Sequence, residues 1–147
     1  MLTSILPKSR IILTETVSNW RQAIDISLQP LLNEGCICDS YKKAILNMYA
    51  KLGPYFVLGP GIALLHARPE DGVNKLSLGM TIIKNGVSFD SPDNDPVRLI
   101  VTLAATDKNS HLDIIASVSE LFLNEEDINK LIQSNTISDI YSIIKKY

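Results

Sequence analysis

The fold is decided by the middle of the chain, which reads LSLGMTII at residues 76–83 and VRLIVTLAA at residues 97–105. In the first stretch every second side chain is large and apolar, a period that predicts a strand with one well-buried face. The second stretch is nearly continuously apolar, interrupted by Arg98 and Thr102, and predicts a strand covered on both faces. A shorter apolar strand is expected over residues 61–66, and Asn85-Gly86 is typical of a turn.

Helical periodicity precedes these strands. A first helix is predicted over residues 20–34, with Asn19 as its cap and with Pro30 kinking or dividing it. A second helix is predicted over residues 40–52, with Asp39 as its cap. Its expected buried stripe consists of Tyr41, Ala44, Ile45, Met48 and Leu52.

Helical periodicity also returns after the strands. Apolar spacing predicts one helix over residues 112–122, Asn124 can cap the next, and Ser138 opens a last one. Helices, a cluster of strands and helices again indicate an α/β fold with three layers. We expect residues 1–147 to form a single domain, because that length suits one hydrophobic core.

Composition and charge exclude several classes of protein. The 46% hydrophobic and 20% charged shares are those of a globular protein, and a net charge of -2 argues against nucleic-acid binding. The longest aliphatic runs are too short to span a bilayer, so no membrane insertion is expected. Because no apolar stretch follows Lys8 and Arg10, we expect no signal peptide and a cytoplasmic protein.

The two cysteines, Cys36 and Cys38, have a C-x-C spacing that raises the question of a metal or redox pair. A zinc site needs more ligands, and this chain has no second cysteine pair and two isolated histidines. We therefore expect no metal site, and interpret both cysteines as small side chains in a connector after a helix.

The two histidines are the candidates for chemistry. His66 ends the short apolar strand, and His111 is expected in the first turn of a helix that Ser110 caps. Such a helix start favours an anion and a neutral imidazole. One ring could attack phosphorus while the other holds the phosphoryl oxygens, and Arg68 could neutralise their charge. The alternative is that both histidines are structural and that Arg68 is an ordinary surface residue.

The region around His66 resembles the active-site region of a known family. Residues 53–57 read GPYFV and residues 59–73 read GPGIALLHARPEDGV. This resembles the type-2 enzyme IIA domains of the sugar phosphotransferase system, the mannitol/fructose class, and within it most the ascorbate-type branch, whose members read GPY…PGIALPHARPEDGV. The likeness continues through residues 103–107 and 110–112 and covers essentially the whole chain.

The resemblance implies a mixed β-sheet flanked by helices on both faces, and a reaction. His66 would accept the phosphoryl group, and His111 would assist phosphate binding. Phosphate would arrive from the carrier protein HPr and leave to a cysteine on a cognate enzyme IIB, and through it reach the membrane enzyme IIC. The sugar would be ascorbate or a related one, and no cofactor is implied. We expect an apolar rim for these partners, with Tyr55, Phe56 and Leu65 as candidates.

Two departures from the family pattern stand out. Leu65 replaces the proline that usually precedes the active histidine, which removes a φ constraint and restores a backbone N–H. Mannitol-type members carry an arginine on the preceding helix, where this chain offers Lys51, so Arg68 could supply that charge. An alternative function also follows from the family, because related domains act as phosphorylation-sensing regulators not coupled to transport. The ascorbate-like motif favours transport.

Overall fold

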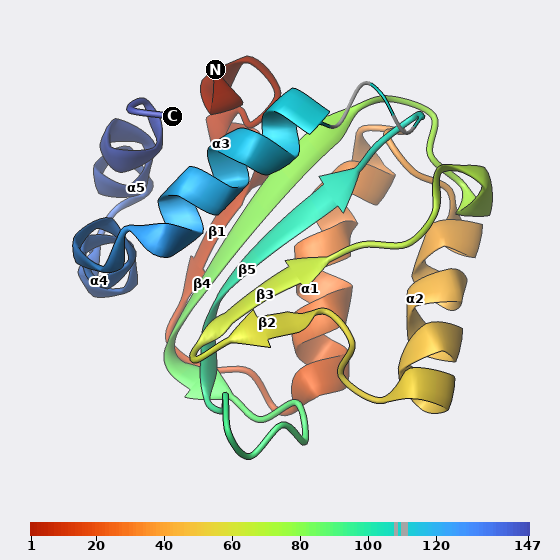
Figure 1. Cartoon of the computed structure of the whole chain (residues 1–147), viewed down its shortest axis with the longest axis horizontal. Helices are drawn as coiled ribbons and strands as arrows, with labels where there is room; N and C mark the ends of the chain where they lie inside the picture. Colours follow the sequence, from red (N-terminus) through yellow and green to blue (C-terminus); the bar gives the residue numbers. More distant parts are fainter. Residues whose placement is uncertain (108, 110–111) are drawn as a thin grey trace.

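The computed structural model describes residues 1–107, 109 and 112–147, and within them five strands form one sheet in the order β1-β4-β5-β3-β2 (Figure 1). Strand β1 pairs with β4 and β3 with β5 in parallel, whereas β4–β5 and β2–β3 are antiparallel. The sheet is therefore mixed, as the family resemblance implied. The strands are β1 (Ile11–Thr14), β2 (Val57–Gly59), β3 (Ile62–Leu65), β4 (Ser77–Val87) and β5 (Val97–Ala104).

Helices cover both faces of this sheet. Two helices before the central strands, α1 (Trp20–Asn33) and α2 (Asp39–Leu52), lie on one face. The other face carries α3 (Leu112–Leu123), α4 (Glu125–Gln133) and α5 (Ile137–Ile144), together with the N-terminal segment (Figure 1). Short 3-10 turns are η1 (Leu2–Ser4), η2 (Lys8–Arg10) and η3 (Pro69–Asp71). The predicted three-layer α/β fold is confirmed.

Strand β5 contributes side chains to both hydrophobic cores. Leu99 and Leu103 pack in the core with α3 to α5, whereas Ile100 and Ala104 pack in the core with α1 and α2. Strand side chains alternate between faces, so a strand covered by helices on both sides must be apolar at nearly every position. The prediction for this strand is confirmed.

Strand β4 is buried on both faces over residues 77–83, so the prediction of one buried face was wrong. Gly79, which has no side chain, and the small Thr81 lie under α1 and allow that helix to approach closely. A Cβ at Gly79 would lie 3.0 Å from Leu31 Cδ1, and Ser27 Oγ donates a hydrogen bond to Thr81 Oγ1 at 2.9 Å. The alternation thus reflects close helix packing and not exposure to water.

The turn predicted at Asn85-Gly86 was also wrong, because both residues lie inside β4. The β4–β5 register shifts between Ile82 and Val87, and Gly86 has a φ of +74° there. Positive φ suits glycine, which here forms an irregularity in the strand and not a hairpin turn.

The polar caps of three helices follow the rules of helix starts, but two positions differ from expectation. Asn19 and Asn124 cap α1 and α4, each accepting an N–H from three residues further on, as predicted. Asp39 is the first residue of α2 and not its cap; Cys38 holds the cap position without a side-chain bond. The last helix begins one residue before Ser138 and is capped by Thr136.

The two N-terminal helices differ from expectation in their interiors. Pro30 lies inside α1 but does not divide it, and the helix continues to Asn33. In α2, Tyr41 and Ile45 are buried as predicted, whereas Leu52 is 66% exposed at the C-terminal end. Among the described residues, no helix is long and apolar enough to cross a membrane.

Candidate functional site

The site is built where two parallel strands end side by side. His66 directly follows β3, whose last residue, Leu65, pairs with Thr102 of β5. Because β3 and β5 are parallel, their carboxyl ends lie at the same edge of the sheet, where α/β proteins commonly bind ligands. A hollow of about 180 Å³ opens at this edge. Its lining consists of Leu64, His66, Ala67, Pro69, Leu103, Ala105 and Ile115.

The imidazole of His66 is oriented by its own strand. Its Nδ1 lies 2.7 Å from the carbonyl oxygen of Leu64. A carbonyl oxygen only accepts hydrogen bonds, so this contact requires the proton on Nδ1. In the neutral ring the lone pair is then on Nε2, which makes Nε2 the nucleophilic nitrogen.

Two tyrosines hold the backbone beside His66. The Tyr55 hydroxyl donates to the His66 carbonyl oxygen at 2.5 Å, and its ring meets the imidazole edge-on with centroids 5.6 Å apart. The Tyr41 hydroxyl accepts from the Ala67 N–H at 2.9 Å and donates to the Leu103 carbonyl at 2.6 Å. Burial raises the pKa of both tyrosines from the ordinary value of about 10 to about 12.

The apolar surroundings of His66 differ in part from the predicted rim. Tyr55 lies beside His66, but Phe56 and Leu65 are fully buried in the core with α1 and α2. Leu65 points to that core because neighbouring strand residues face opposite sides. The apolar walls of the His66 hollow are instead Leu64, Leu103 and Ile115. The hydrogen bonds of Tyr41 were also not predicted from the sequence. Strand parity could have found Leu64, whereas Leu103 and Ile115 needed the strand register and the helix packing.

Arg68 and Lys51 lie together, but around another hollow. Arg68 is exposed, and its backbone N–H donates to the Asp71 carboxylate at 2.9 Å. With Asn47 and Asp71, both basic residues line a hollow of about 190 Å³ between α2 and η3. His66 lines the neighbouring hollow instead.

The other two predicted site residues, Ser110 and His111, lie outside the described residues. Cys36 is buried and Cys38 exposed in the connector between α1 and α2, where the sequence placed them. Across the described part of the chain, no three His, Cys, Asp or Glu side chains gather in a way that could hold a metal ion.

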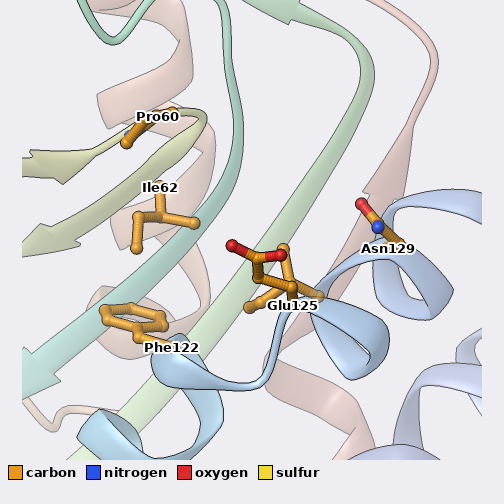
Figure 2. A pocket seen from close by; sticks show the side chains of 6 residues that line it. Pro60, Ile62, Phe122, Glu125 and Asn129 are labelled. Atoms are coloured by element: carbon orange, nitrogen blue, oxygen red, sulfur yellow. The ribbon is translucent and has the colours of Figure 1, made fainter.

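A larger hollow, of about 320 Å³, lies at the opposite end of β3 (Figure 2). Ile62, the first residue of that strand, lines it, and Glu125 is its charged side chain. The full lining is Pro60, Ile62, Phe122, Glu125, Ile128 and Asn129. These residues include no histidine or cysteine, whereas His66 lines the hollow at the other end of the strand.

Comparison with known proteins agrees with this geometry. Residues 4–147 match the family described as "Phosphoenolpyruvate-dependent sugar phosphotransferase system, EIIA 2". The chain is 36% identical to the mannitol-specific cryptic phosphotransferase enzyme IIA component of Escherichia coli (strain K12), covering 99% of this chain and 98% of the relative. It is 33% identical to the ascorbate-specific PTS system EIIA component of the same strain, covering 97% and 94%.

Solved structures give the same result. The solution structure of the mannitol-specific cryptic enzyme IIA CmtB from Escherichia coli aligns with a TM-score of 0.90 at 35% identity, covering 99% of each chain. The complex of enzyme IIAMTL with phosphorylated enzyme IIBMTL from Escherichia coli aligns with a TM-score of 0.81 at 25% identity, covering 95% of this chain and 96% of that one. The chain therefore belongs to the type-2 enzyme IIA family of the sugar phosphotransferase system, whose members are phosphotransferases with a phosphohistidine intermediate.

Proposed function

We propose that this protein carries a phosphoryl group on His66 between two protein partners. The observation that carries the proposal is the hydrogen bond from His66 Nδ1 to the Leu64 carbonyl, beside an open hollow at the strand end. Nε2 attacks the phosphorus of phospho-HPr, and the bond from phosphorus to the HPr histidine breaks as the new one forms. A cysteine thiolate of enzyme IIB then takes the same group from Nε2, which restores the free imidazole.

The rest of the phosphate site is assigned from the sequence. His111 holds the phosphoryl oxygens together with the N–H groups at the start of α3, and Ser110 contributes there. The position of Ala105 in the lining of the His66 hollow supports this role, because the chain leaves β5 at that edge. In this proposal Arg68, two residues after His66, adds positive charge to the phosphate site, although it lines the neighbouring hollow together with Lys51 and Asp71.

Partners and setting follow from the relatives. The alignment with enzyme IIAMTL in complex with phosphorylated IIBMTL supports an enzyme IIB partner, and through it a membrane enzyme IIC. HPr is the donor that the family implies. Residues 1–147 act as one cytoplasmic domain in this scheme, and the transfer between imidazole and partner side chains involves no cofactor.

The sugar in this proposal is ascorbate or a related one, supported by the ascorbate-like motif around His66. The relatives named for mannitol and for ascorbate are similarly close, at 36% and 33% identity. The test is transfer from the phosphorylated protein to purified enzyme IIB of each type. Faster transfer to a mannitol-type enzyme IIB would contradict the ascorbate assignment.

The phosphocarrier function itself predicts one modification. Incubation with enzyme I, HPr and phosphoenolpyruvate should add a single phosphoryl group that is labile in acid and stable in base. Intact-mass measurement and site mapping should place it on His66, while omission of HPr should leave the mass unchanged. A phosphoryl group on His111, Cys36 or Cys38 would overturn the assignment.

A further inference from the structure

The peptide group between His66 and Ala67 has an unusual set of partners. Its carbonyl oxygen accepts from the Tyr55 hydroxyl at 2.5 Å, and its N–H donates to the Tyr41 hydroxyl at 2.9 Å. Backbone groups in a sheet normally pair with a neighbouring strand. Here two phenols hold both ends of one peptide plane, immediately after the nucleophilic residue.

Tyr41 takes the place of a direct bond between strands. The β3–β5 register ends at Leu65 and Thr102, and beyond it the phenol bridges the Ala67 N–H and the Leu103 carbonyl. Two hydrogen bonds in series, of 2.9 and 2.6 Å, hold these groups further apart than the single bond of about 2.9 Å in a ladder. The strand ends are therefore separated at the point where the His66 hollow opens, and Ala67 and Leu103 both line it.

We propose that Tyr41 and Tyr55 are positioning residues that clamp this peptide group and thereby hold the His66 imidazole in the orientation that phosphoryl transfer needs. The inference rests on the function proposed above. The Leu64 carbonyl oxygen accepts a hydrogen bond from Nδ1 of the ring, and the two phenols hold the peptide group that follows His66. The ring of Tyr55 also packs against the imidazole. Little freedom then remains for Nε2, which must approach phosphorus in line.

The environment of the phenols supports a fixed clamp. Tyr41 is fully buried, and an unpaired buried hydroxyl is costly, so its two bonds are strongly favoured. Both tyrosines come from α2 and the loop that follows it, so this helix braces the site from the side opposite α3.

The test removes one hydroxyl at a time. Tyr55→Phe and Tyr41→Phe keep the rings and delete the clamp bonds. Tyr49→Phe is the matched control, because Tyr49 also lies on α2 and its hydroxyl donates to a main-chain carbonyl, that of Phe89, at 2.8 Å. Two readouts are needed: single-turnover phosphorylation by phospho-HPr at several HPr concentrations, and the ring ¹⁵N spectrum of His66 before any phosphorylation.

We expect both clamp variants to lower the maximal transfer rate by about 10- to 100-fold, the scale of a small misplacement of a reacting group. The HPr concentration for half-maximal rate should not change. The neutral His66 ring should be protonated on Nδ1 in the wild type and in Tyr49→Phe, and become a mixture of tautomers in the clamp variants. Tyr55 is only half-buried, so loss of its hydroxyl should disturb folding less than loss of the buried Tyr41 hydroxyl. If Tyr41→Phe does not fold, Tyr55→Phe alone tests the proposal.

Three outcomes would contradict the proposal that Tyr41 and Tyr55 orient the His66 ring. They are rates equal to that of Tyr49→Phe, a slower rate with an unchanged tautomer, and a changed tautomer with an unchanged rate. If the wild-type protein accepts no phosphoryl group, the proposed function fails. The tautomer spectra then still decide whether the phenols orient the ring.

Discussion

At the scale of single residues, His66 shows how a strand end can orient an imidazole ring. The imidazole Nδ1 bonds to the carbonyl oxygen of Leu64, the strand residue on the same face, so in the neutral ring the unprotonated nitrogen is Nε2, the one that the proposed transfer uses. The substitution of Leu65 for the family proline does not leave this approach unrestrained. Leu65 is fully buried and pairs with Thr102, so core packing and the ladder hold the chain where a proline ring would.

The two histidines should separate by role when each is replaced. His66→Ala removes the nucleophile, so transfer from HPr should vanish and not merely slow. His111→Ala leaves the nucleophile and removes one donor to the phosphoryl oxygens, which typically slows such reactions about 10²- to 10³-fold. Rapid-quench phosphorylation measures both, after circular dichroism shows that the variants are folded. Transfer by the His66 variant alongside a dead His111 variant would reverse the assignment.

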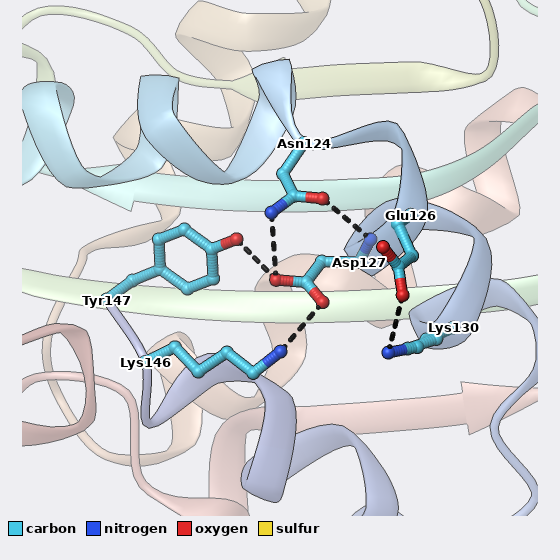
Figure 3. A network of polar contacts seen from close by, with 6 residues as sticks. All are labelled: Asn124, Glu126, Asp127, Lys130, Lys146 and Tyr147. Atoms are coloured by element: carbon cyan, nitrogen blue, oxygen red, sulfur yellow. Dashed lines mark hydrogen bonds and ion pairs between the residues drawn. The ribbon is translucent and has the colours of Figure 1, made fainter.

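At the scale of secondary-structure elements, α4 is joined to the segment after α5 by a buried carboxylate. Asp127, 3% exposed, accepts hydrogen bonds from the Tyr147 hydroxyl at 2.5 Å, Lys146 Nζ at 3.0 Å and Asn124 Nδ2 at 3.2 Å (Figure 3). The bond from Tyr147, followed by that from Lys146, lowers the pKa of Asp127 below its ordinary value. The carboxylate also lies in the first turn of α4, where the helix dipole favours a negative charge.

This network should make folding stability depend on pH in the acid range. The native pKa of Asp127 is depressed, so its contribution is complete above the unfolded pKa of about 3.9 and is lost as pH falls through the native pKa. Asp127→Ala should lower the free energy of unfolding at pH 7 by about 1.5 to 3 kcal/mol, the scale of a hydrogen bond to a charged group. Urea unfolding at a series of pH values should show that deficit shrinking below pH 4.

A neighbouring pair on the same helix gives the control. Glu126 and Lys130 form an exposed ion pair at 3.0 Å, one turn apart (Figure 3). Exposed pairs of this kind contribute little, so Glu126→Gln should leave the urea midpoint essentially unchanged. If it shifts the midpoint as much as Asp127→Ala does, burial is not the reason for the effect.

At the scale of the whole molecule, one sheet serves two cores. Adjacent residues of β5, Leu99 and Ile100, are both fully buried but face opposite helical layers. The single tryptophan, Trp20, belongs to the α1 side, where its ring stacks on Tyr49 with centroids 4.2 Å apart. Its fluorescence therefore reports on one layer, whereas far-ultraviolet circular dichroism reports on all helices.

If residues 1–147 form one cooperative domain, a destabilising substitution in either core should shift the unfolding transition seen by tryptophan fluorescence and by circular dichroism alike. Leu99→Ala and Ile100→Ala should each lower the free energy of unfolding by about 2 to 5 kcal/mol, because each leaves a cavity in a packed core. Leu99 faces away from the Trp20 layer, yet its variant should shift the tryptophan transition and the circular-dichroism transition together. Separated transitions would show that the two layers unfold independently.

The periods of hydrophobicity, the capping asparagines and the His66 segment were readable in the sequence because each is a local property of a short stretch. They determined the helices, the strands β3 and β5, the α/β class and the candidate nucleophile. Long-range contacts decided the rest. The sequence pattern places Gly79 and Thr81 on an exposed strand face, but in the fold α1 packs on them. Asn85-Gly86 is typical of a turn, but in the fold Pro96 packs against Gly86, and a Cβ on Gly86 would lie 2.7 Å from Pro96 Cβ.

The features of the candidate site also divide into those that the sequence predicted and those that only the fold shows. The chemistry of His66 is intrinsic to imidazole, and its face of the strand follows from parity, so both could be predicted from residue order. The roles of Tyr41 and Leu103 could not, because the two residues are distant in sequence and meet only when α2 covers the carboxyl ends of β3 and β5. Sequence thus determined the candidate reactive group, and tertiary structure decided how that group is held, since hydrogen bonds between distant segments exist only in the folded chain.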